Sequence, residues 1–293
     1  MTAIKKQTFR ERSRSVLKSI WYSPRFRAVA FAPVDALERA RGRDPLLPPR
    51  RLQYVGRRED FAPVGAYWRD RLVRDNGVGP DADVLDIGCG IGRAAVALIP
   101  QLPAGTYEGF DVVPQFVAWC SREITSRHPN FRFRVADVRN RQYNRHGDVA
   151  PSEYEFPFAD GSFDAALAAS VFTHMEPDGV RRYLGESARV LRPGGVLVST
   201  FFLVDDEVEG RLRGPGPAFA LDHRLTDAAG EAYLAADPRV PEFCVGIFEP
   251  QLIAAAAEAG FEPGPAIERG WWSGREVPGD APYQDVVTLR KPV

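Results

Sequence analysis

The stretch Val84–Arg93, which reads Val-Leu-Asp-Ile-Gly-Cys-Gly-Ile-Gly-Arg, constrains the fold of this 293-residue chain more than any other segment. A short apolar strand runs into glycines at positions 88, 90 and 92, and an alanine-rich helix follows. Glycines let the backbone turn sharply and let a ligand approach where a Cβ atom would block it. The start of the helix offers unpaired N–H groups and the positive end of the helix dipole. The stretch therefore predicts a nucleotide-like ligand at the carboxyl end of strand 83–87.

The spacing of the glycines separates this turn from the dinucleotide-binding fingerprint. That fingerprint reads G-x-G-x-x-G, whereas this chain reads Asp86-x-Gly88-x-Gly90-x-Gly92, with the third glycine one residue earlier. A bound pyrophosphate needs the helix N-terminus held open to it, so the earlier glycine argues against a dinucleotide. Two alternatives stay open: a nicotinamide dehydrogenase, and a tight turn that binds nothing.

The residues after this turn alternate between strand and helix patterns, which predicts a parallel sheet with helices on both faces. The second strand ends at Asp111, where an acidic group can accept hydrogen bonds from a ribose diol. The third ends at Asp137, which can accept from the exocyclic amine of an adenine, while Val138 offers a backbone N–H and an apolar wall. Helix capping is the alternative for both acids. Strands are expected at 83–87, 106–111, 131–137, 163–170, 196–202, 261–268 and 284–290, and helices at 92–99, 114–127, 177–192 and 249–259.

Further strings follow in order: Phe163-Asp-Ala-Ala-Leu-Ala-Ala-Ser-Val-Phe-Thr-His174, Arg189-Val-Leu-Arg-Pro-Gly-Gly195 and Glu258-Ala-Gly-Phe261. With the glycine turn and both acids, they resemble the class I S-adenosylmethionine (SAM)-dependent methyltransferases over roughly 80–290. The resemblance implies a Rossmann-like α/β fold whose seven-stranded sheet is mostly parallel, with an antiparallel last strand. It implies SAM as cofactor, bound by Asp86, Gly88, Cys89, Gly90, Gly92, Asp111, Val112, Asp137, Val138 and Ser170.

The activity that the resemblance implies is methyl transfer to a small-molecule or glycan-linked acceptor, with a hydroxyl as the favoured methyl-accepting group. His174 is the candidate base because imidazole titrates near neutral pH and this residue follows the fourth strand. Its alternative role is to brace the next helix. Further candidates for contact with the acceptor are Asn140, Tyr143, Asn144, His223, Trp271 and Trp272. A SAM-binding partner or regulator without transfer activity is the alternative function.

Charge divides the chain into two parts. Through Arg58 the sequence holds fifteen Lys or Arg against four Asp or Glu, and the remainder holds 23 against 35. We therefore expect a basic arm and linker at 1–58 and the methyltransferase domain at 59–293, with a polar loop at 138–162 and an insertion at 203–246 that can serve as an acceptor lid. The arm is interpreted as a solvated extension. Peripheral membrane docking stays open, because Phe9, Val16, Leu17, Ile20 and Trp21 can share a helical face.

Composition sets outer limits on the function. Hydrophobic residues make up 44% and charged residues 26%, as in ordinary globular proteins. The three cysteines are widely spaced, which indicates neither a disulfide framework nor a metal site and favours the cytoplasm. No apolar run approaches the ~18 residues of a membrane span. The Asn-Pro-Pro-Tyr-type motif of enzymes that methylate nucleic-acid amino groups does not follow the fourth strand, which argues against nucleic acid as acceptor. The oligomeric state stays open.

Overall fold

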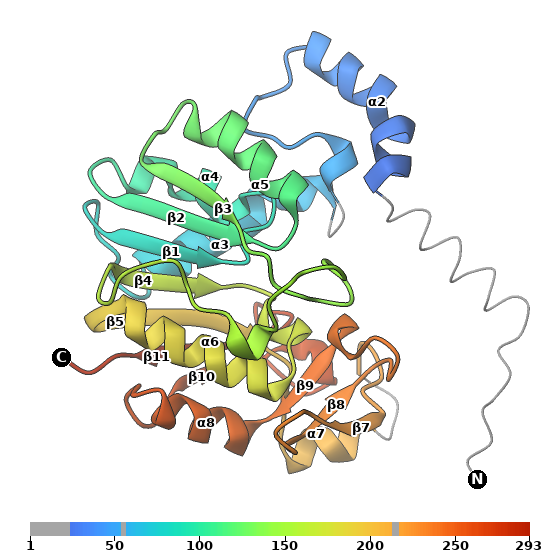
Figure 1. The fold of residues 1–293 in the computed structure, drawn as a ribbon, viewed down its shortest axis with the longest axis vertical. Coiled ribbons are helices and arrows are strands. Elements are labelled where there is room, and N and C mark those ends of the chain that lie inside the picture. The colour runs from blue at the N-terminus through green and yellow to red at the C-terminus, as the bar shows by residue number, and fades with distance from the viewer. Residues whose placement is uncertain (1–23, 54–56, 213–216) are drawn as a thin grey trace, which may run out of the picture. The chain divides into compact units, whose positions relative to one another are not determined.

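A computed structural model of the chain describes residues 24–53, 57–212 and 217–293. The chain divides into two compact units, one ending at Val64 and one beginning at Gly65 (Figure 1). No helix in the described ranges is long and apolar enough to cross a membrane. Phe9, Val16, Leu17, Ile20 and Trp21, the proposed docking face of the arm, lie outside the described residues.

The first unit contains helix α2 (Pro24–Ala40), which is held by its own arginines and acids. The guanidinium of Arg27 donates to the backbone carbonyls of Arg50, Arg51 and Gln53 at 2.8–3.0 Å. The Asp35 carboxylate accepts the Arg50 N–H and the Arg51 guanidinium at 2.7 and 2.8 Å. These contacts fold the segment that follows α2 back on the helix, within the region that the sequence assigns to the basic arm and linker.

The second unit is built on a seven-stranded sheet of order β10-β11-β5-β4-β1-β2-β3. Strands β1 to β5 are parallel to one another, and β11 is antiparallel to both β5 and β10. The predicted α/β class and antiparallel last strand are confirmed. The strands are β1 (Asp83–Ile87), β2 (Thr106–Asp111), β3 (Phe131–Val135), β4 (Phe163–Ala168), β5 (Leu191–Phe201), β10 (Ala266–Glu268) and β11 (Asp285–Arg290).

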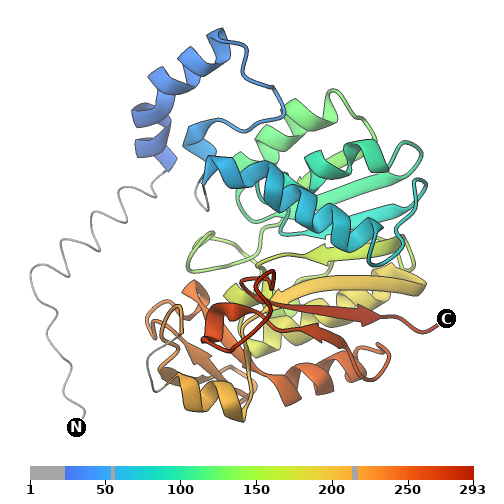
Figure 2. The same cartoon turned by 180° about the vertical axis from the view of Figure 1, so that it is seen from behind.

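Helices cover both faces of this sheet. Helix α6 (Pro177–Val190) lies in front of the sheet in Figure 1, with α8 (Glu249–Glu258) packed beside it. Helix α3 (Phe61–Val73) lies on the opposite face, toward the viewer in Figure 2. It packs closely on α4 (Arg93–Leu98), since a Cβ atom at Gly65 would lie 2.4 Å from the Arg93 carbonyl oxygen.

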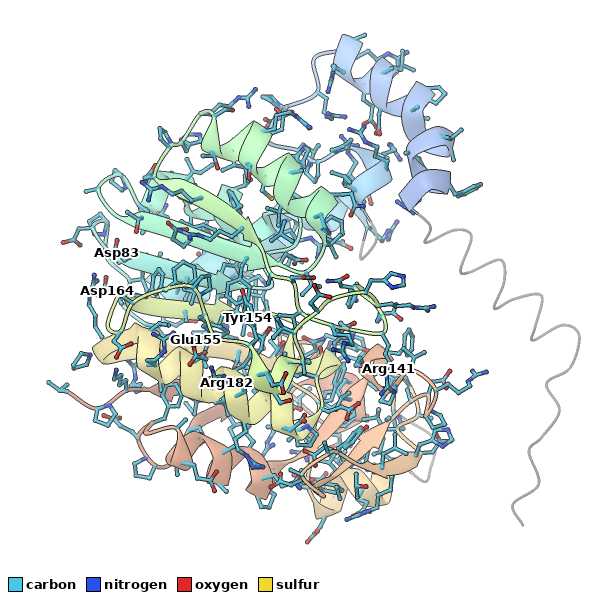
Figure 3. The ribbon with its side chains drawn as sticks, viewed as in Figure 1. Asp83, Arg141, Tyr154, Glu155, Asp164 and Arg182 are labelled. Atoms are coloured by element: carbon cyan, nitrogen blue, oxygen red, sulfur yellow. The ribbon has the colours of Figure 1, made fainter. Side chains whose placement is uncertain are left out.

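Arg192 ties together the amino ends of three strands. Its guanidinium contacts the Asp164 carboxylate at 2.6 Å and the Asp83 carboxylate at 2.7 Å. Figure 3 shows these two acids side by side, at the end of the sheet opposite Arg141. These ion pairs therefore stabilise the amino ends of the strands, whereas the carboxyl ends are followed by the loops that can form a site. The sequence predicts the fifth strand at 196–202, but β5 begins five residues earlier, at Leu191, and carries a register shift against β4.

Several boundaries differ from the sequence expectation. The α5 helix (Pro114–Cys120) continues as a π-helical turn at Ser121–Thr125. Strands β3 and β4 end two residues early, and β10 begins five residues late at Ala266. These shifts leave Asp137 and Ser170 in loops beyond the strands rather than inside them.

The insertion at 203–246 has more regular structure than its sequence pattern indicates. A second sheet of order β6-β9-β8-β7 begins just beyond the carboxyl end of β5. Its core includes Phe202, Val204, Leu234 and Trp272. Its elements are β6 (Leu203–Val204), α7 (Asp206–Arg211), β7 (His223–Thr226), β8 (Ala232–Ala235) and β9 (Val245–Phe248).

The loop at 138–162 is polar only in its first half. In its second half, Tyr154 and Phe156 pack in a ring cluster with Phe110 of β2 and Tyr183 of α6. Arg189 then fixes the backbone of this half by donating to the carbonyl of Phe156 at 3.0 Å. Aromatic burial therefore anchors the end of the loop to α6, while the segment near Asn140 remains at the carboxyl edge of the sheet.

Candidate active site

The glycine turn after β1 is held by the end of β2. The N–H groups of Gly88 and Cys89 both donate to the Phe110 carbonyl, at 2.8 and 3.0 Å. Gly88, Gly90 and Gly92 all have positive φ, which L-residues rarely adopt. A Cβ at Gly88 would lie 2.6 Å from Val171, and one at Gly92 would lie 2.8 Å from a side-chain atom of Ile124. At Gly90 nothing lies within 4 Å, so the turn has one open side.

Asp111, at the end of β2, is oriented toward this turn by backbone donors. One carboxylate oxygen accepts the Gly90 N–H and the other accepts the Val113 N–H, each at 2.8 Å. Burial raises the pKa of Asp111 to about 6, and the hydrogen bonds from Val113, Gly90 and Val112 oppose that rise. Each oxygen of a carboxylate can accept a second hydrogen bond, so Asp111 keeps the capacity to bind a diol.

Asp86 lies beneath the turn rather than on its open side. Its side chain is 3% exposed and accepts a hydrogen bond from the Tyr107 hydroxyl. Burial raises the pKa of Asp86 to about 7, with a further contribution from the charge of Asp111. The thiols of Cys89 and Cys120 are also buried, and burial raises the pKa of both. In this structure the side chains of Asp86 and Cys89 are therefore buried beneath the turn and do not line its open side.

Asp137 and Val138 follow β3 at the same edge. The Asp137 side chain is exposed, and no described residue hydrogen-bonds to its carboxylate. The Val138 N–H likewise has no acceptor in the described ranges. The Val138 side chain is only 2% exposed in the main core, so the expectation that it forms an apolar wall is wrong for this side chain. Val112 is partly buried at the end of β2 and packs against the same core.

Ser170 marks the end of β4 with an unusual backbone. It is the one residue other than glycine with positive φ in the described ranges, at 58°. Its N–H donates to the Thr200 hydroxyl at 2.7 Å, and its own hydroxyl donates to the Gln284 side chain at 2.9 Å. Such strained residues cluster at functional sites, because the surrounding structure must hold them in place.

His174 lies six residues beyond β4, where the polar loop and the insertion meet. Its Nδ1 lies 2.8 Å from the carbonyl oxygen of Glu242, which can only accept, so Nδ1 carries the proton. The Asn140 side chain donates to the His174 carbonyl at 3.2 Å, and the Tyr143 ring contacts the imidazole edge-on at 5.4 Å between centroids. Burial lowers the pKa of His174, opposed by the carbonyls of Glu242 and Phe243. The imidazole is therefore neutral near pH 7.

Three predicted acceptor residues thus lie together, since Asn144 also exchanges two backbone hydrogen bonds with Asn140. The other three lie apart from them. Trp272 is fully buried against Phe202 and donates to Asp285 at 2.7 Å, so its predicted contact with an acceptor is wrong. Trp271 is 50% exposed beside Tyr283. His223 lies at the start of β7, 3.6 Å from Asp222.

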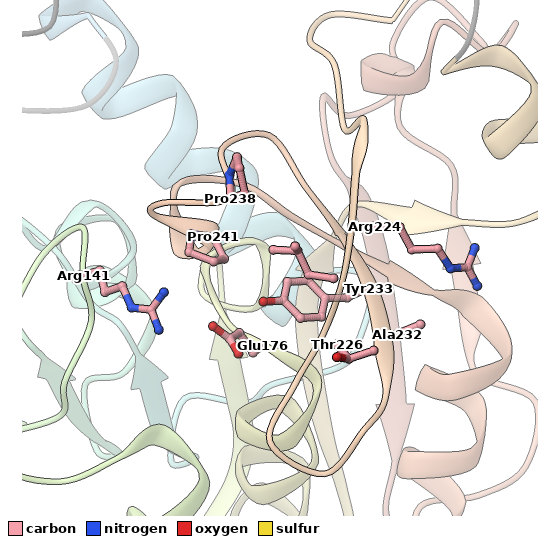
Figure 4. A pocket seen from close by; sticks show the side chains of 9 residues that line it. Arg141, Glu176, Arg224, Thr226, Ala232, Tyr233, Pro238 and Pro241 are labelled. Atoms are coloured by element: carbon pink, nitrogen blue, oxygen red, sulfur yellow. The ribbon is translucent and has the colours of Figure 1, made fainter. Parts of the chain in front are cut away.

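A pocket of about 640 Å³ includes Pro241 in its lining, next to the Glu242 that contacts His174, and none of its lining residues was named from the sequence. Arg141 comes from the polar loop, Glu176 precedes α6, and Tyr233 lies on β8 (Figure 4). Glu176 follows His174 by two residues in His-Met-Glu-Pro, and Arg141 follows Asn140, so both adjoin residues that the sequence did single out. Tyr233 carries no such signal, because the insertion's hairpin was not expected.

Residues 84–195 match the family model described as a methyltransferase domain. This segment runs from β1 into β5 and contains the glycine turn, Asp111, Asp137 and His174. The segment is therefore similar to the methyltransferase domains of class I SAM-dependent enzymes, and SAM is the cofactor that this similarity indicates. The observed edge fits that cofactor, with an open side at Gly90, an oriented carboxylate at Asp111, an unpartnered carboxylate at Asp137 and an unpartnered N–H at Val138 among the described residues.

The particular relatives are methyltransferases with different acceptors in their names. The chain is 32% identical over 133 residues to a demethylmenaquinone methyltransferase of Tropheryma whipplei, covering 45% of this chain and 47% of the relative. It is 32% identical over 127 residues to the phthiotriol/phenolphthiotriol dimycocerosates methyltransferase 1 of Mycobacterium ulcerans, covering 43% and 39%. The matches thus span about half the length of these relatives or less. A solved candidate O-methyltransferase of Nostoc punctiforme, 15% identical with a TM-score of 0.50, shares the fold over 79% of this chain and 56% of its own.

Proposed function

We propose that this protein is a SAM-dependent methyltransferase that methylates a hydroxyl group of a small-molecule or glycan-linked acceptor. The observation that carries the proposal is the pairing of Asp111 with Gly90 across the carboxyl ends of β1 and β2. That bond fixes a carboxylate beside the one open side of the glycine turn. A turn without a ligand has no need for a buried acid whose pKa is raised to about 6.

The proposed cofactor contacts follow from what each group can donate or accept. Asp111 accepts from the ribose hydroxyls, Asp137 accepts from the adenine amine, and the Val138 N–H donates to the adenine ring. Gly90 admits the cofactor where a side chain would stand. Bound SAM supplies a methyl group on a positively charged sulfur, which is already electrophilic. The protein's main task is therefore to position the acceptor, and positioning alone can supply effective molarities of about 10⁵ M or more.

His174 is the proposed base for a hydroxyl acceptor. Because Nδ1 donates to the Glu242 carbonyl, the neutral ring holds its lone pair on Nε2. Asn140 donates to the backbone carbonyl of His174, and the Tyr143 ring packs edge-on against the imidazole, so both contacts help to hold the residue in place. A lowered pKa keeps the ring unprotonated at neutral pH and able to take a proton. The names of the relatives differ in their acceptors, so the hydroxyl rests on His174 alone.

Calorimetric titration with SAM and with NAD tests the cofactor part of the proposal. We expect SAM to bind at one site and NAD to give no heat. Binding of NAD without SAM would refute the proposal in favour of a dehydrogenase. Binding of SAM without turnover of any acceptor in cell extract would instead support the alternative of a SAM-binding regulator.

A further inference from the structure

The pocket that Pro241 lines is built by three segments that are distant in the sequence. Arg141 belongs to the polar loop, Glu176 stands directly before α6, and Arg224 and Tyr233 lie on β7 and β8 of the small sheet. Figure 4 shows the Glu176 carboxylate beside the Tyr233 hydroxyl, with Arg141 on the far side of the acid. A volume of about 640 Å³ lies in the range of small-molecule sites, which span about 300–1,000 Å³.

We propose that this pocket binds the acceptor as a neutral, hydroxyl-rich ring of the sugar class. The proposal deepens the proposed function, on which it rests for the statement that the ligand is the methyl acceptor. The side chains of the pocket show which charges are already compensated and which hydrogen-bonding groups remain available.

Both arginines of the pocket are already paired with acids. Arg141 lies 3.5 Å from the Glu242 carboxylate, and its backbone N–H donates to the same oxygen at 3.4 Å. Arg224 lies 3.3 Å from Glu209 and stacks over the Phe248 ring at 4.7 Å. A carboxylate or phosphate on the ligand would have to compete with these acids and would lie close to Glu176. The pocket therefore disfavours an anionic ligand.

The acidic wall does not favour a cation either. The Tyr233 hydroxyl lies beside the Glu176 carboxylate and lowers the pKa of that carboxyl, against the effect of burial. Burial, and then the neighbouring charge of Glu242, raise the pKa of Glu176, so the negative charge of this carboxyl is disfavoured in the pocket. An ammonium group there would also stand near the guanidinium of Arg141, at the cost of like-charge repulsion. A neutral hydroxyl avoids both penalties, because it can donate to Glu176 and accept from Arg141 in the same position.

Apart from Thr226, the rest of the lining is apolar and suits the carbon face of a ring. Leu225 and Pro241 line the pocket beside the polar groups. A sugar ring presents C–H groups on its faces and hydroxyls on its rim, so it can meet both kinds of surface at once. Pro241 is followed by Glu242, whose carbonyl accepts from His174. The segment that would contact the sugar ring through Pro241 therefore also orients His174, the proposed base, through the Glu242 carbonyl.

Saturation-transfer NMR on the full-length protein tests the ligand class. The probes are neutral methyl glycosides of hexoses, pentoses and 6-deoxyhexoses, with the matching uronic acids and amino sugars. We expect transfer to one or more neutral glycosides and little to their charged counterparts. Tyr233→Phe and Glu176→Gln should weaken that binding by about 3- to 10-fold, the effect of losing one hydrogen bond. Tyr283→Phe is the matched control, since this tyrosine packs on Trp271 away from the pocket lining.

The outcomes separate this proposal from the proposed function. Preferential binding of uronic acids or amino sugars, binding of no glycoside, or equal binding by the Tyr233→Phe and Tyr283→Phe variants would overturn the assignment of the pocket. SAM affinity, measured by calorimetry on the same variants, should be unchanged. Glycoside binding by a protein that does not bind SAM would refute the methyltransferase proposal, while the ligand class of the pocket would be supported.

Discussion

Replacing Asp111 with Asn tests the cofactor cradle most specifically. The native carboxylate accepts from Gly90 with one oxygen and from Val113 with the other, both at 2.8 Å. An asparagine has the same shape but only one acceptor oxygen, so its amide N–H₂ must face one of the two backbone donors. The variant therefore loses one charge-assisted hydrogen bond and weakens the support for the ribose hydroxyls.

A hydrogen bond to a charged group contributes about 1.5–3 kcal/mol. If most of that difference appears in cofactor binding, the dissociation constant for SAM should rise by about 10- to 150-fold. Binding should also depend on pH. Because the pKa of Asp111 is raised to about 6 and SAM is a cation, SAM should favour the ionised acid. A fall of about two pKa units on binding would make the wild type about tenfold weaker at pH 5 than at pH 8 from this group alone.

Isothermal titration calorimetry at several pH values gives both quantities, and circular dichroism shows whether each variant folds. Asp81→Asn is the matched control, because Asp81 is an exposed acid in the turn before β1. A folded Asp111→Asn protein that binds SAM as tightly as the wild type, and with the same pH dependence, would refute the role of Asp111 in the cradle.

Three further predictions follow from the same contacts. Gly90→Ala should lower the stability measured in thermal unfolding by about 1–2 kcal/mol, the strain of its positive φ, yet abolish most SAM binding. Gly88→Ala should destabilise the protein more, because its Cβ would lie 2.6 Å from a neighbouring side chain. A Gly90→Ala protein that binds SAM as tightly as the wild type would contradict this prediction. The pKa of Asp86 is raised to about 7, so the stability that this protonated acid contributes is complete below about pH 4 and is lost as the pH rises through 7. In urea unfolding between pH 5 and 7, the wild type should lose about 1.4 kcal/mol of unfolding free energy per pH unit relative to Asp86→Asn. A difference between the two proteins that does not change with pH would contradict the raised pKa. His174→Asn, which can still donate to the Glu242 carbonyl, should lower turnover by about 10²- to 10⁴-fold with unchanged SAM affinity, and equal loss of both would indicate a bracing role.

The main sheet could be predicted because its signals are local. The apolar strand 83–87 and the glycines of the turn are neighbours in sequence, and Asp111 ends the next expected strand, 21 residues beyond Gly90. The same holds for the boundaries of β1, β2 and α8, which agree with expectation to within one residue. Periodicity and turn chemistry are properties of neighbours in sequence, so a single sequence contains them.

The rest of the site depends on contacts between distant segments. Glu242, which orients His174, is 68 residues away from it in the sequence. Tyr233 lies near Glu176 because β8 pairs within the small sheet, and the strands of that sheet are four residues long or shorter. Trp272 has the composition of a ligand-stacking residue, yet its indole N–H is satisfied by Asp285 inside a small core. Nothing adjacent in the sequence distinguishes a tryptophan that packs from one that binds.

Transfer of an isotopically labelled methyl group tests the central proposal most directly. The protein is incubated with labelled SAM and an extract of the cells that carry it, and products are followed by mass spectrometry. The account predicts a labelled small-molecule or glycan product with the methyl group on oxygen, strongly reduced with the His174→Asn variant. The absence of any labelled product, from a protein shown by calorimetry to bind SAM, would contradict it.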